Sequence, residues 1–319
     1  MKRLTPTLLL LALTLSACRL APRAATPLPA TPAPDSTSPS SPALAPSTAF
    51  APVARSGEPV FNLRYSDEPA SDPRMLTLDV YPTDQPNSPV MIYVHGGGWY
   101  RGAKSRVDFK PAAYNAHGFA FVSINYRLYP DNTISDQMAD VAAAIAWVKN
   151  NIAQYGGDPN RIFLMGHSAG AHLVSLVATD ESYLAAEGLS LSDLRGVIAM
   201  DTQAYDINTL LLNMPETNGQ VYRTVFGDDP ENWKKFSPIT YIAPGQNIPP
   251  FFIIYTGEKP GRSELSNMFK ESLERAGIPT AIQPAVEKTH GEVNSQFGKP
   301  DDALSSIVFR WLEEILAGL

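Results

Sequence analysis

The sequence predicts an α/β fold in which a mainly parallel sheet of eight strands is flanked by helices. From Gly57 onward, short runs rich in β-branched and aromatic residues alternate with stretches of helical length. Several of these runs are apolar without interruption, as in strands that are covered on both faces. Such an alternation implies parallel strands joined by right-handed crossovers. With 319 residues, 44% of them hydrophobic, the chain can bury one large core.

The expected strands follow one another along the chain. Val60–Tyr65 and Met75–Tyr81 are expected to form an antiparallel pair that opens the sheet. Six further runs complete the set of eight: Val90–Val94, Phe119–Asn125, Arg161–Met165, Val197–Met200, Phe251–Tyr255 and Thr280–Val286.

Helical stretches lie between these strands. Ser135–Gln154 shows the helical pattern most clearly, because its apolar residues share one broad face and Gly156-Gly157 follows its end. Three further helices are expected at Ala169–Thr179, Ser263–Ala276 and Asp302–Leu316. Residues 205–246 lack clear periodicity and are long for a simple connection, so we expect a small cap insertion there. The α/β domain is thus predicted to span residues 57–319.

The first 56 residues have a different composition. Basic residues at positions 2 and 3 precede the apolar run Leu8–Leu15, which predicts a signal peptide over residues 1–18. Leu15-Ser16-Ala17-Cys18 resembles a bacterial lipobox, which implies cleavage before Cys18 and a lipid on that residue. The alternative is a plain signal peptide with an incidental cysteine. Residues 19–56 are nearly all Ala, Pro, Ser and Thr and are expected to form a disordered linker.

The charge of the remaining chain restricts its partners. Residues 1–56 hold five of the 25 basic and one of the 32 acidic side chains, so the other 20 and 31 give residues 57–319 a net charge of −11. An acidic body without Lys/Arg clusters argues against nucleic acid or an anionic membrane surface as a partner. The leader predicts an exported protein of the cell envelope, and together with the acidic charge we expect it to reach a bacterial membrane only through the lipid at Cys18.

The strongest motif is Gly166-His167-Ser168-Ala169-Gly170. An apolar strand candidate leads into it, and a helix candidate continues from Ala169. This strand–turn–helix setting is typical of a nucleophile elbow, in which a strained turn exposes the serine above the sheet. Small flanking residues are needed there because the backbones pass closely. Ser168 is therefore the candidate nucleophile.

A second motif, His95-Gly96-Gly97-Gly98-Trp99, directly follows the strand candidate Val90–Val94. Consecutive glycines let backbone N–H groups turn toward a ligand without clashes of Cβ atoms. The motif resembles the glycine turn of the α/β-hydrolase fold, which supplies half of an oxyanion hole. This implies that the N–H groups of Gly97, Gly98 and Ala169 hold the oxyanion, each contributing about 3–4 kcal/mol in the transition state.

The general base is found by elimination among the five histidines. His95 belongs to the glycine turn, His167 precedes the nucleophile, His172 lies on the following helix, and His117 precedes a strand. Only His290 follows the last strand, as the Ser…acid…His chain order of this fold requires. His290 is therefore the candidate base.

Two residues remain open as the acid of the triad. In most relatives the acid is an Asp shortly after the strand that corresponds to Phe251–Tyr255, but here the following turn contains Glu258 and no Asp. The other candidate is Asp201, which ends the preceding strand. Asp201 is the preferred choice, because a carboxylate at a strand end is better fixed than one on a flexible turn.

Together these motifs identify a family. From about Val90 to His290 the chain resembles the bacterial carboxylesterase branch of the α/β-hydrolases, which includes feruloyl/acetyl-xylan esterase-like and kynurenine formamidase-like proteins. The likeness rests on His95–Trp99, Asn125-Tyr126-Arg127-Leu128, Gly156-Gly157-Asp158-Pro159 with Arg161-Ile162, and Gly166–Leu173. The missing Asp after the seventh strand departs from the common pattern.

The expected activity is hydrolysis of carboxylic esters with short-chain or aryl acyl groups through an acyl-enzyme. Two alternatives stay open: an arylformamidase or peptidase on the same scaffold, and a tethered binding protein without catalysis. No metal or organic cofactor is expected, because no His, Cys or carboxylate cluster has the spacing of metal ligands. The sequence does not indicate an oligomeric state.

Overall fold

The structure is a computed structural model that describes residues 57–213, 216–257 and 261–318. The predicted signal peptide, the predicted lipid site at Cys18, the linker 19–56 and Glu258 lie outside the described residues. Within the described ranges, no helix has the length and apolar character needed to cross a membrane.

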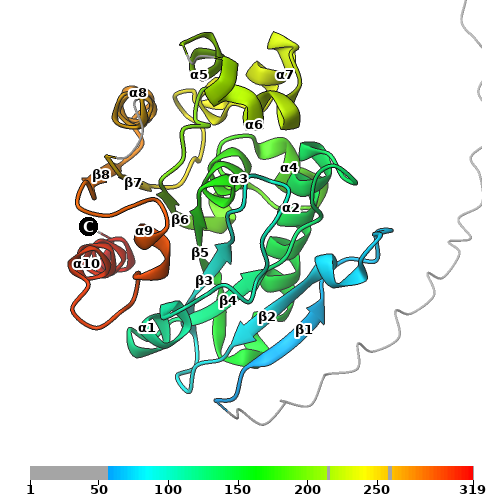
Figure 1. The fold of residues 1–319 in the computed structure, drawn as a ribbon. Helices are drawn as coiled ribbons and strands as arrows, with labels where there is room; N and C mark the ends of the chain where they lie inside the picture. The colour runs from blue at the N-terminus through cyan, green and yellow to red at the C-terminus, as the bar shows by residue number, and fades with distance from the viewer. Residues whose placement is uncertain (1–56, 214–215, 258–260, 319) are drawn as a thin grey trace, which may run out of the picture. The chain divides into compact units, whose positions relative to one another are not determined.

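The described chain forms one sheet of eight strands (Figure 1), which confirms the predicted fold class. The strand order is β1-β2-β4-β3-β5-β6-β7-β8. β1 and β2 form the predicted antiparallel pair, β2 is antiparallel to β4, and the other neighbours are parallel. The strands are β1 (Val60–Arg64), β2 (Thr77–Tyr81), β3 (Ser88–Val94), β4 (Ala120–Ile124), β5 (Gly157–His167), β6 (Leu194–Met200), β7 (Phe251–Tyr255) and β8 (Thr280–Pro284).

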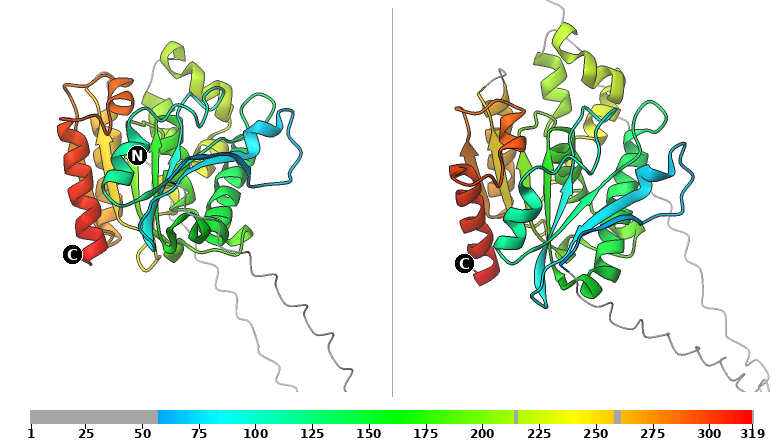
Figure 2. Two further views of the ribbon diagram at one scale, coloured as in Figure 1. Left: turned by 90° about the horizontal axis from the view of Figure 1, so that it is seen from below. Right: turned by 60° about the horizontal axis from the view of Figure 1, so that its bottom comes forward.

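Helices cover both faces of the sheet, and in Figure 2 the red helix α10 and the green helix α2 lie on opposite sides of it. Short 3-10 turns link some of the elements, at Pro73–Leu76, Ile152–Tyr155, Leu191–Asp193 and Pro238–Tyr241. The helices are α1 (Lys110–Ala116), α2 (Ile134–Asn151), α3 (Ala169–Val177), α4 (Glu181–Ala186), α5 (Ile207–Asn213), α6 (Glu216–Phe226), α7 (Pro230–Lys235), α8 (Arg262–Arg275), α9 (Glu292–Ser295) and α10 (Ala303–Ala317).

Alternation along the strands builds two cores. In β3, Met91 and Tyr93 join the core that contains residues of α1, α9 and α10, whereas Val90, Ile92 and Val94 join the core that contains residues of α2, α3 and α8. Successive side chains of a strand point to opposite faces, so an unbroken apolar run supplies both cores at once. The strands that carry the site are therefore fixed from both sides.

The longest helix begins one residue before its predicted start and ends earlier than predicted. Thr133 and Asp136 form a capping box at its N-terminus. The regular helix ends at Asn151, and the chain tightens into the 3-10 turn Ile152–Tyr155. Gly156 then stops it with a φ of 90°, as a glycine after a helix commonly does.

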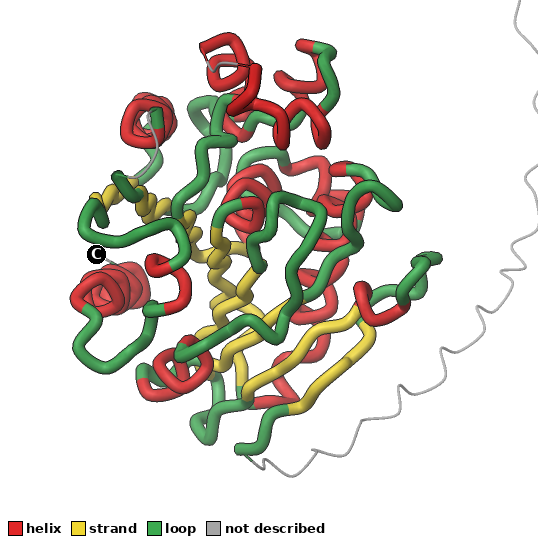
Figure 3. The backbone as a smooth tube through the Cα atoms, viewed as in Figure 1, coloured by secondary structure: helices red, strands yellow, loops and turns green. Residues whose placement is uncertain are grey.

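The stretch between β6 and β7, which the sequence assigns to a cap, contains α5, α6, α7 and a 3-10 turn. Figure 3 shows these helices as short red segments grouped beyond one end of the strands. Their buried residues, which include Ile207, Leu211, Phe226 and Trp233, pack into the core that also contains α3. We call residues 207–241 the helical insertion.

Candidate active site

Ser168 stands on a sharp turn between β5 and α3. Its φ is 56° and its ψ is −118°, a conformation that L-residues rarely adopt. The two motif glycines make the turn possible. A Cβ on Gly166 would lie 2.3 Å from the carbonyl oxygen of Gly170, and a Cβ on Gly170 would lie 2.1 Å from the carbonyl oxygen of Val94. The elbow can form here because glycine at these two positions leaves room for the backbone, whereas a side chain at either position would collide with it.

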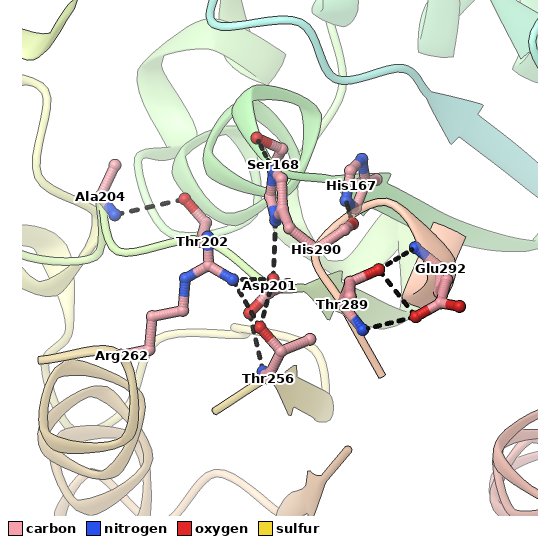
Figure 4. Close-up of polar contacts among 10 residues, drawn as sticks. All are labelled: His167, Ser168, Asp201, Thr202, Ala204, Thr256, Arg262, Thr289, His290 and Glu292. Atoms are coloured by element: carbon pink, nitrogen blue, oxygen red, sulfur yellow. Dashed lines mark hydrogen bonds and ion pairs between the residues drawn. The ribbon is translucent and has the colours of Figure 1, made fainter. Parts of the chain in front are cut away.

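The structure brings Ser168, His290 and Asp201 into one hydrogen-bonded chain (Figure 4). His290 Nε2 lies 3.0 Å from Ser168 Oγ, and His290 Nδ1 lies 2.6 Å from Asp201 Oδ2. A carboxylate can only accept, so Nδ1 carries the proton and Nε2 accepts from the serine hydroxyl. This arrangement is that of a nucleophile, a base and an orienting acid.

Asp201, at the end of β6, is fixed by hydrogen bonds from several donors. Its side chain is fully buried, and its carboxylate also accepts from Thr256 N at 2.8 Å, from Thr256 Oγ1 at 2.9 Å and from Arg262 Nη1. Burial raises the pKa of Asp201, but the hydrogen bond from His290, the charge of Arg262 and the Thr256 amide outweigh it and hold this pKa below its ordinary value. The carboxylate is therefore ionised and fixed.

The loop that carries His290 is anchored by residues of three elements, β5, α1 and β3. His167 Nε2 donates to the carbonyl oxygen of His290 at 2.8 Å, and burial lowers the pKa of His167 to about 3, with a further contribution from His290. Asn294 on α9 is held by Lys110 Nζ and by Tyr93 Oη, each at 2.7 Å. A neutral His167 thus positions the backbone of His290.

The glycine turn lies directly against the elbow. A Cβ on Gly96 would lie 2.7 Å from the carbonyl oxygen of His167 and 3.0 Å from Ser168 Cβ. Gly97 and Gly98 have φ values of 132° and 64°, which favour glycine. Ala169 is the first residue of α3, so its N–H has no acceptor within the helix. The three amides named from the sequence therefore belong to two segments packed together beside the nucleophile.

Trp99, which follows the glycine turn, connects it to the helical insertion. Its ring meets Tyr222 and Phe226 of α6 edge-on, with centroids 5.5 and 4.9 Å apart. Its indole N–H donates to His172 Nδ1 at 3.2 Å, so His172 Nε2 carries the proton and donates to the carbonyl oxygen of Phe236 at 2.7 Å. His172 thus joins the glycine turn, α3 and the insertion.

The remaining histidines have other partners: His95 contacts the carbonyl oxygen of Gly96, and His117 stacks on Phe309. In the part of the chain that the structure describes, no group of three or more His, Cys, Asp or Glu side chains could hold a metal ion.

Sequence reasoning missed the supporting roles of Thr256, Arg262 and His167. Thr256 stands directly after β7, where the common pattern has its acid, and this position was the one available signal. No local pattern marks Arg262, because its partner Asp201 is 61 residues away.

Comparison with known proteins shows which family this chain belongs to and which proteins it is similar to. Residues 78–260 match the family model described as BD-FAE. The esterase LipQ of Mycobacterium tuberculosis is 36% identical over 217 residues, covering 64% of this chain and 50% of LipQ. The probable isoprenylcysteine alpha-carbonyl methylesterase ICMEL2 of Arabidopsis thaliana is 29% identical over 232 residues, covering 68% of this chain and 54% of the relative. This chain thus spans about half the length of these curated relatives.

Among solved structures, esterase B from Lactobacillus rhamnosis superposes with a TM-score of 0.68 at 20% sequence identity. The match covers 82% of this chain and 86% of that one. At this identity the likeness shows a shared fold.

Proposed function

The chain belongs to the BD-FAE family, and from this premise we propose that it is a serine hydrolase that cleaves carboxylic esters through an acyl-enzyme intermediate. The observation that carries the proposal is the hydrogen-bonded chain from Ser168 Oγ through His290 to Asp201. The names of relatives support it, since they include an esterase, a probable carboxylic ester hydrolase and a para-nitrobenzyl esterase.

Acylation is the first half of the reaction. Ser168 Oγ forms a bond to the acyl carbon while its proton passes to His290 Nε2. Negative charge moves to the carbonyl oxygen, where the N–H groups of Gly97, Gly98 and Ala169 hold it. The intermediate then collapses: the bond to the alcohol oxygen breaks, and His290 gives its proton to the leaving alcohol.

Deacylation repeats these steps with water. His290 takes a proton from water as its oxygen attacks the acyl carbon, and the same amides hold the oxyanion. The bond to Ser168 Oγ breaks, the proton returns to the serine, and the acid leaves. Asp201 stays ionised throughout and stabilises the imidazolium that forms twice in each turnover.

The proposed substrates are esters with short-chain or aryl acyl groups. A screen of p-nitrophenyl esters of increasing acyl length tests this, with Ser168→Ala as the matched variant. We expect turnover to be highest for the short esters and to fall by at least about 10³-fold in Ser168→Ala. A fluorophosphonate probe is expected to label the wild-type protein at Ser168.

Other outcomes of the same assays decide against this proposal. Turnover of N-formylkynurenine or of a peptide panel without turnover of esters would assign another reaction to the scaffold. An intact protein that the fluorophosphonate probe does not label would indicate a binding protein without catalysis.

We also propose that the protein is exported and lipid-anchored through Cys18. The support is the order of a charged start, the apolar run Leu8–Leu15 and the lipobox-like Leu15-Ser16-Ala17-Cys18. Expression of the full chain in a bacterial host, followed by detergent phase partition, tests it. The wild type is expected in the detergent phase and Cys18→Ser in the aqueous phase; equal partition of the two would contradict the anchor.

A further inference from the structure

Beyond the serine, the histidine and the acid, the site contains a buried arginine that the reaction as written does not use. We propose that Arg262 is a positioning residue. It donates to the same Asp201 oxygen that accepts the hydrogen bond from His290, and in this way it fixes the carboxylate. Its charge also sets the lower limit of the pH range in which His290 acts as a base. This inference rests on the proposed function.

Arg262 contacts the acid Asp201 and Thr256, which itself binds that acid (Figure 4). Arg262 is the first residue of α8 and is 3% exposed. Its Nη1 donates to Asp201 Oδ2 and, at 2.6 Å, to Thr256 Oγ1. Thr256 Oγ1 in turn donates to the same Oδ2, so Arg262, Thr256 and His290 share one carboxylate oxygen. A carboxylate held by three donors on one oxygen cannot rotate away from the imidazole.

The charge of Arg262 has a second consequence. A guanidinium stays protonated in proteins, so this cation is permanent. Beside a buried carboxylate it offsets part of the negative charge that His290 experiences. A carboxylate whose charge is partly compensated in this way stabilises the imidazolium less than a carboxylate alone. Loss of the cation is expected to have the opposite effect and to move the acid limb of activity to higher pH.

Other titratable groups around this network belong to several elements, and a change at position 262 leaves all of them in place. They are His167 on β5, Lys110 on α1, Glu292 on α9, and the two tyrosines near Asp201, which are Tyr205 after β6 and Tyr222 on α6. If the acid limb of the pH–activity profile moves when Arg262 is substituted, the movement can therefore be attributed to the loss of Arg262.

The test compares Arg262→Gln, which removes the charge, with Arg262→Lys, which keeps it. The matched control is Arg275→Gln on the same helix, where Arg275 is a surface residue 3.8 Å from Glu271. For each variant, kcat and kcat/KM on p-nitrophenyl acetate are measured between pH 5 and pH 9, together with Tm.

The expected results separate positioning from a purely structural role. In Arg262→Gln the acid limb of kcat/KM moves up by roughly one pH unit, as expected for loss of a neighbouring charge. Its kcat falls roughly tenfold or more, because the carboxylate is no longer fixed, while KM stays within about twofold. In Arg262→Lys the acid limb stays in place, and in Arg275→Gln the whole profile stays unchanged.

Several outcomes overturn the inference. An unmoved acid limb and an unchanged kcat in folded Arg262→Gln would reduce Arg262 to a structural ion pair. If Arg262→Gln does not fold, Arg262→Lys decides alone: reduced kcat with an unmoved limb supports the inference, and a moved limb refutes it because the charge is retained.

Failure of this inference can be distinguished from failure of the proposed function. NMR titration of the His290 imidazole needs no substrate, and its midpoint is expected to rise by the same roughly one pH unit in Arg262→Gln. An inactive wild type with that rise would sink only the esterase activity. An active wild type without the rise would sink only the role of Arg262.

Discussion

Three residues of the site have backbone conformations that side chains disfavour. Trp99, Ser168 and Asp201 have φ values of 67°, 56° and 57°. Each lies beyond the carboxyl end of a parallel strand: Trp99 follows β3, Ser168 follows β5 and Asp201 follows β6. Such conformations cost about 1 kcal/mol or more each and persist only where the surroundings impose them. The chain thus gives up stability to direct these side chains.

A comparison of two inactive variants measures this strain at the nucleophile. Ser168→Gly and Ser168→Ala both remove the hydroxyl, but glycine tolerates a φ of 56° and alanine does not. We expect Ser168→Gly to be more stable than Ser168→Ala by about 1 kcal/mol in urea unfolding. Gly291 is the control, because its φ of −75° is one that alanine also adopts. Here alanine is expected to be the more stable residue, and Gly291→Ala is expected to raise the free energy of unfolding by a few tenths of a kcal/mol. An alanine variant at 168 as stable as the glycine variant would show an unstrained elbow.

Substitution of the acid is expected to affect both activity and folding. Asp201→Asn removes the charge that orients His290 and leaves the buried Arg262 without its counterion. We expect kcat on p-nitrophenyl acetate to fall by roughly 10³-fold. We also expect the free energy of unfolding to fall by about 3 kcal/mol. Glu258→Gln is the comparison variant, and a larger loss of kcat there would move the acid to Glu258.

At the scale of elements, the ends of three neighbouring strands align the site. The amide of Ser168, after β5, donates to the carbonyl oxygen of Met200 at the end of β6 at 2.8 Å. The amide of Asp201, after β6, donates to the carbonyl oxygen of Ile254 in β7 at 2.8 Å. The ladder of the sheet thus continues into the two site residues, and their separation follows from the spacing of adjacent strands. Rigid strands position these groups more accurately than loops would.

The helical insertion supports the glycine turn through α6. Phe226 is 3% exposed and contacts both Trp99 and His172. We expect Phe226→Ala to reduce the free energy of unfolding by about 3–4 kcal/mol. Because Trp99 follows Gly98, we also expect kcat for p-nitrophenyl acetate to fall roughly tenfold through displacement of the turn. The control is Leu212→Ala on α5, at a position that is 70% exposed, which is expected to change neither the free energy of unfolding nor kcat by a measurable amount. If the two variants had equal effects, the helical insertion would not support the glycine turn through Phe226.

The sequence predicts those elements whose place in the fold leaves a recognisable pattern in their own residues. Several of the strands can be predicted because burial on both faces leaves an unbroken apolar run, as in Val90–Val94. The helices α5 and α7 were not predicted, because each has only six or seven residues and too few turns to show a period. Ser168 and His290 follow from motif and chain order. Arg262 does not, since only the crossover between β6 and β7 brings it to Asp201.

At the scale of the whole molecule, three histidines are buried around the site without charge. Burial lowers the pKa of His95 and of His172 to about 4, and lowers that of His167 to about 3, with a smaller contribution from His290 in the last case. Each ring makes a hydrogen bond that needs one N–H donor: to the carbonyl oxygen of Gly96, Phe236 or His290. These neutral rings connect the glycine turn, the insertion and the His290 loop into one acid-sensitive unit.

The expected consequence is acid unfolding at moderately low pH. The unfolded chain binds a proton at each histidine near pH 6.5, whereas the folded chain binds it only near pH 4 or below. The stability from these rings is therefore complete above pH 6.5 and is lost as the pH falls from 6.5 toward 4. Three rings together give a slope of up to about 4 kcal/mol per pH unit. Because domains are stable by only about 5–15 kcal/mol, we expect unfolding between about pH 4 and pH 5.

Urea unfolding at pH 7.5, 6.5, 5.5 and 5.0 measures how the free energy of unfolding depends on pH. One substitution, His172→Gln, tests whether a buried histidine ring contributes to this dependence. In His172→Gln an amide can accept from Trp99 and donate to Phe236 as the ring does, yet it has no proton to gain. The slope below pH 6.5 is expected to decrease by up to about 1.4 kcal/mol per pH unit. A slope that His172→Gln does not change would show that carboxylates, and not the buried rings, govern acid unfolding.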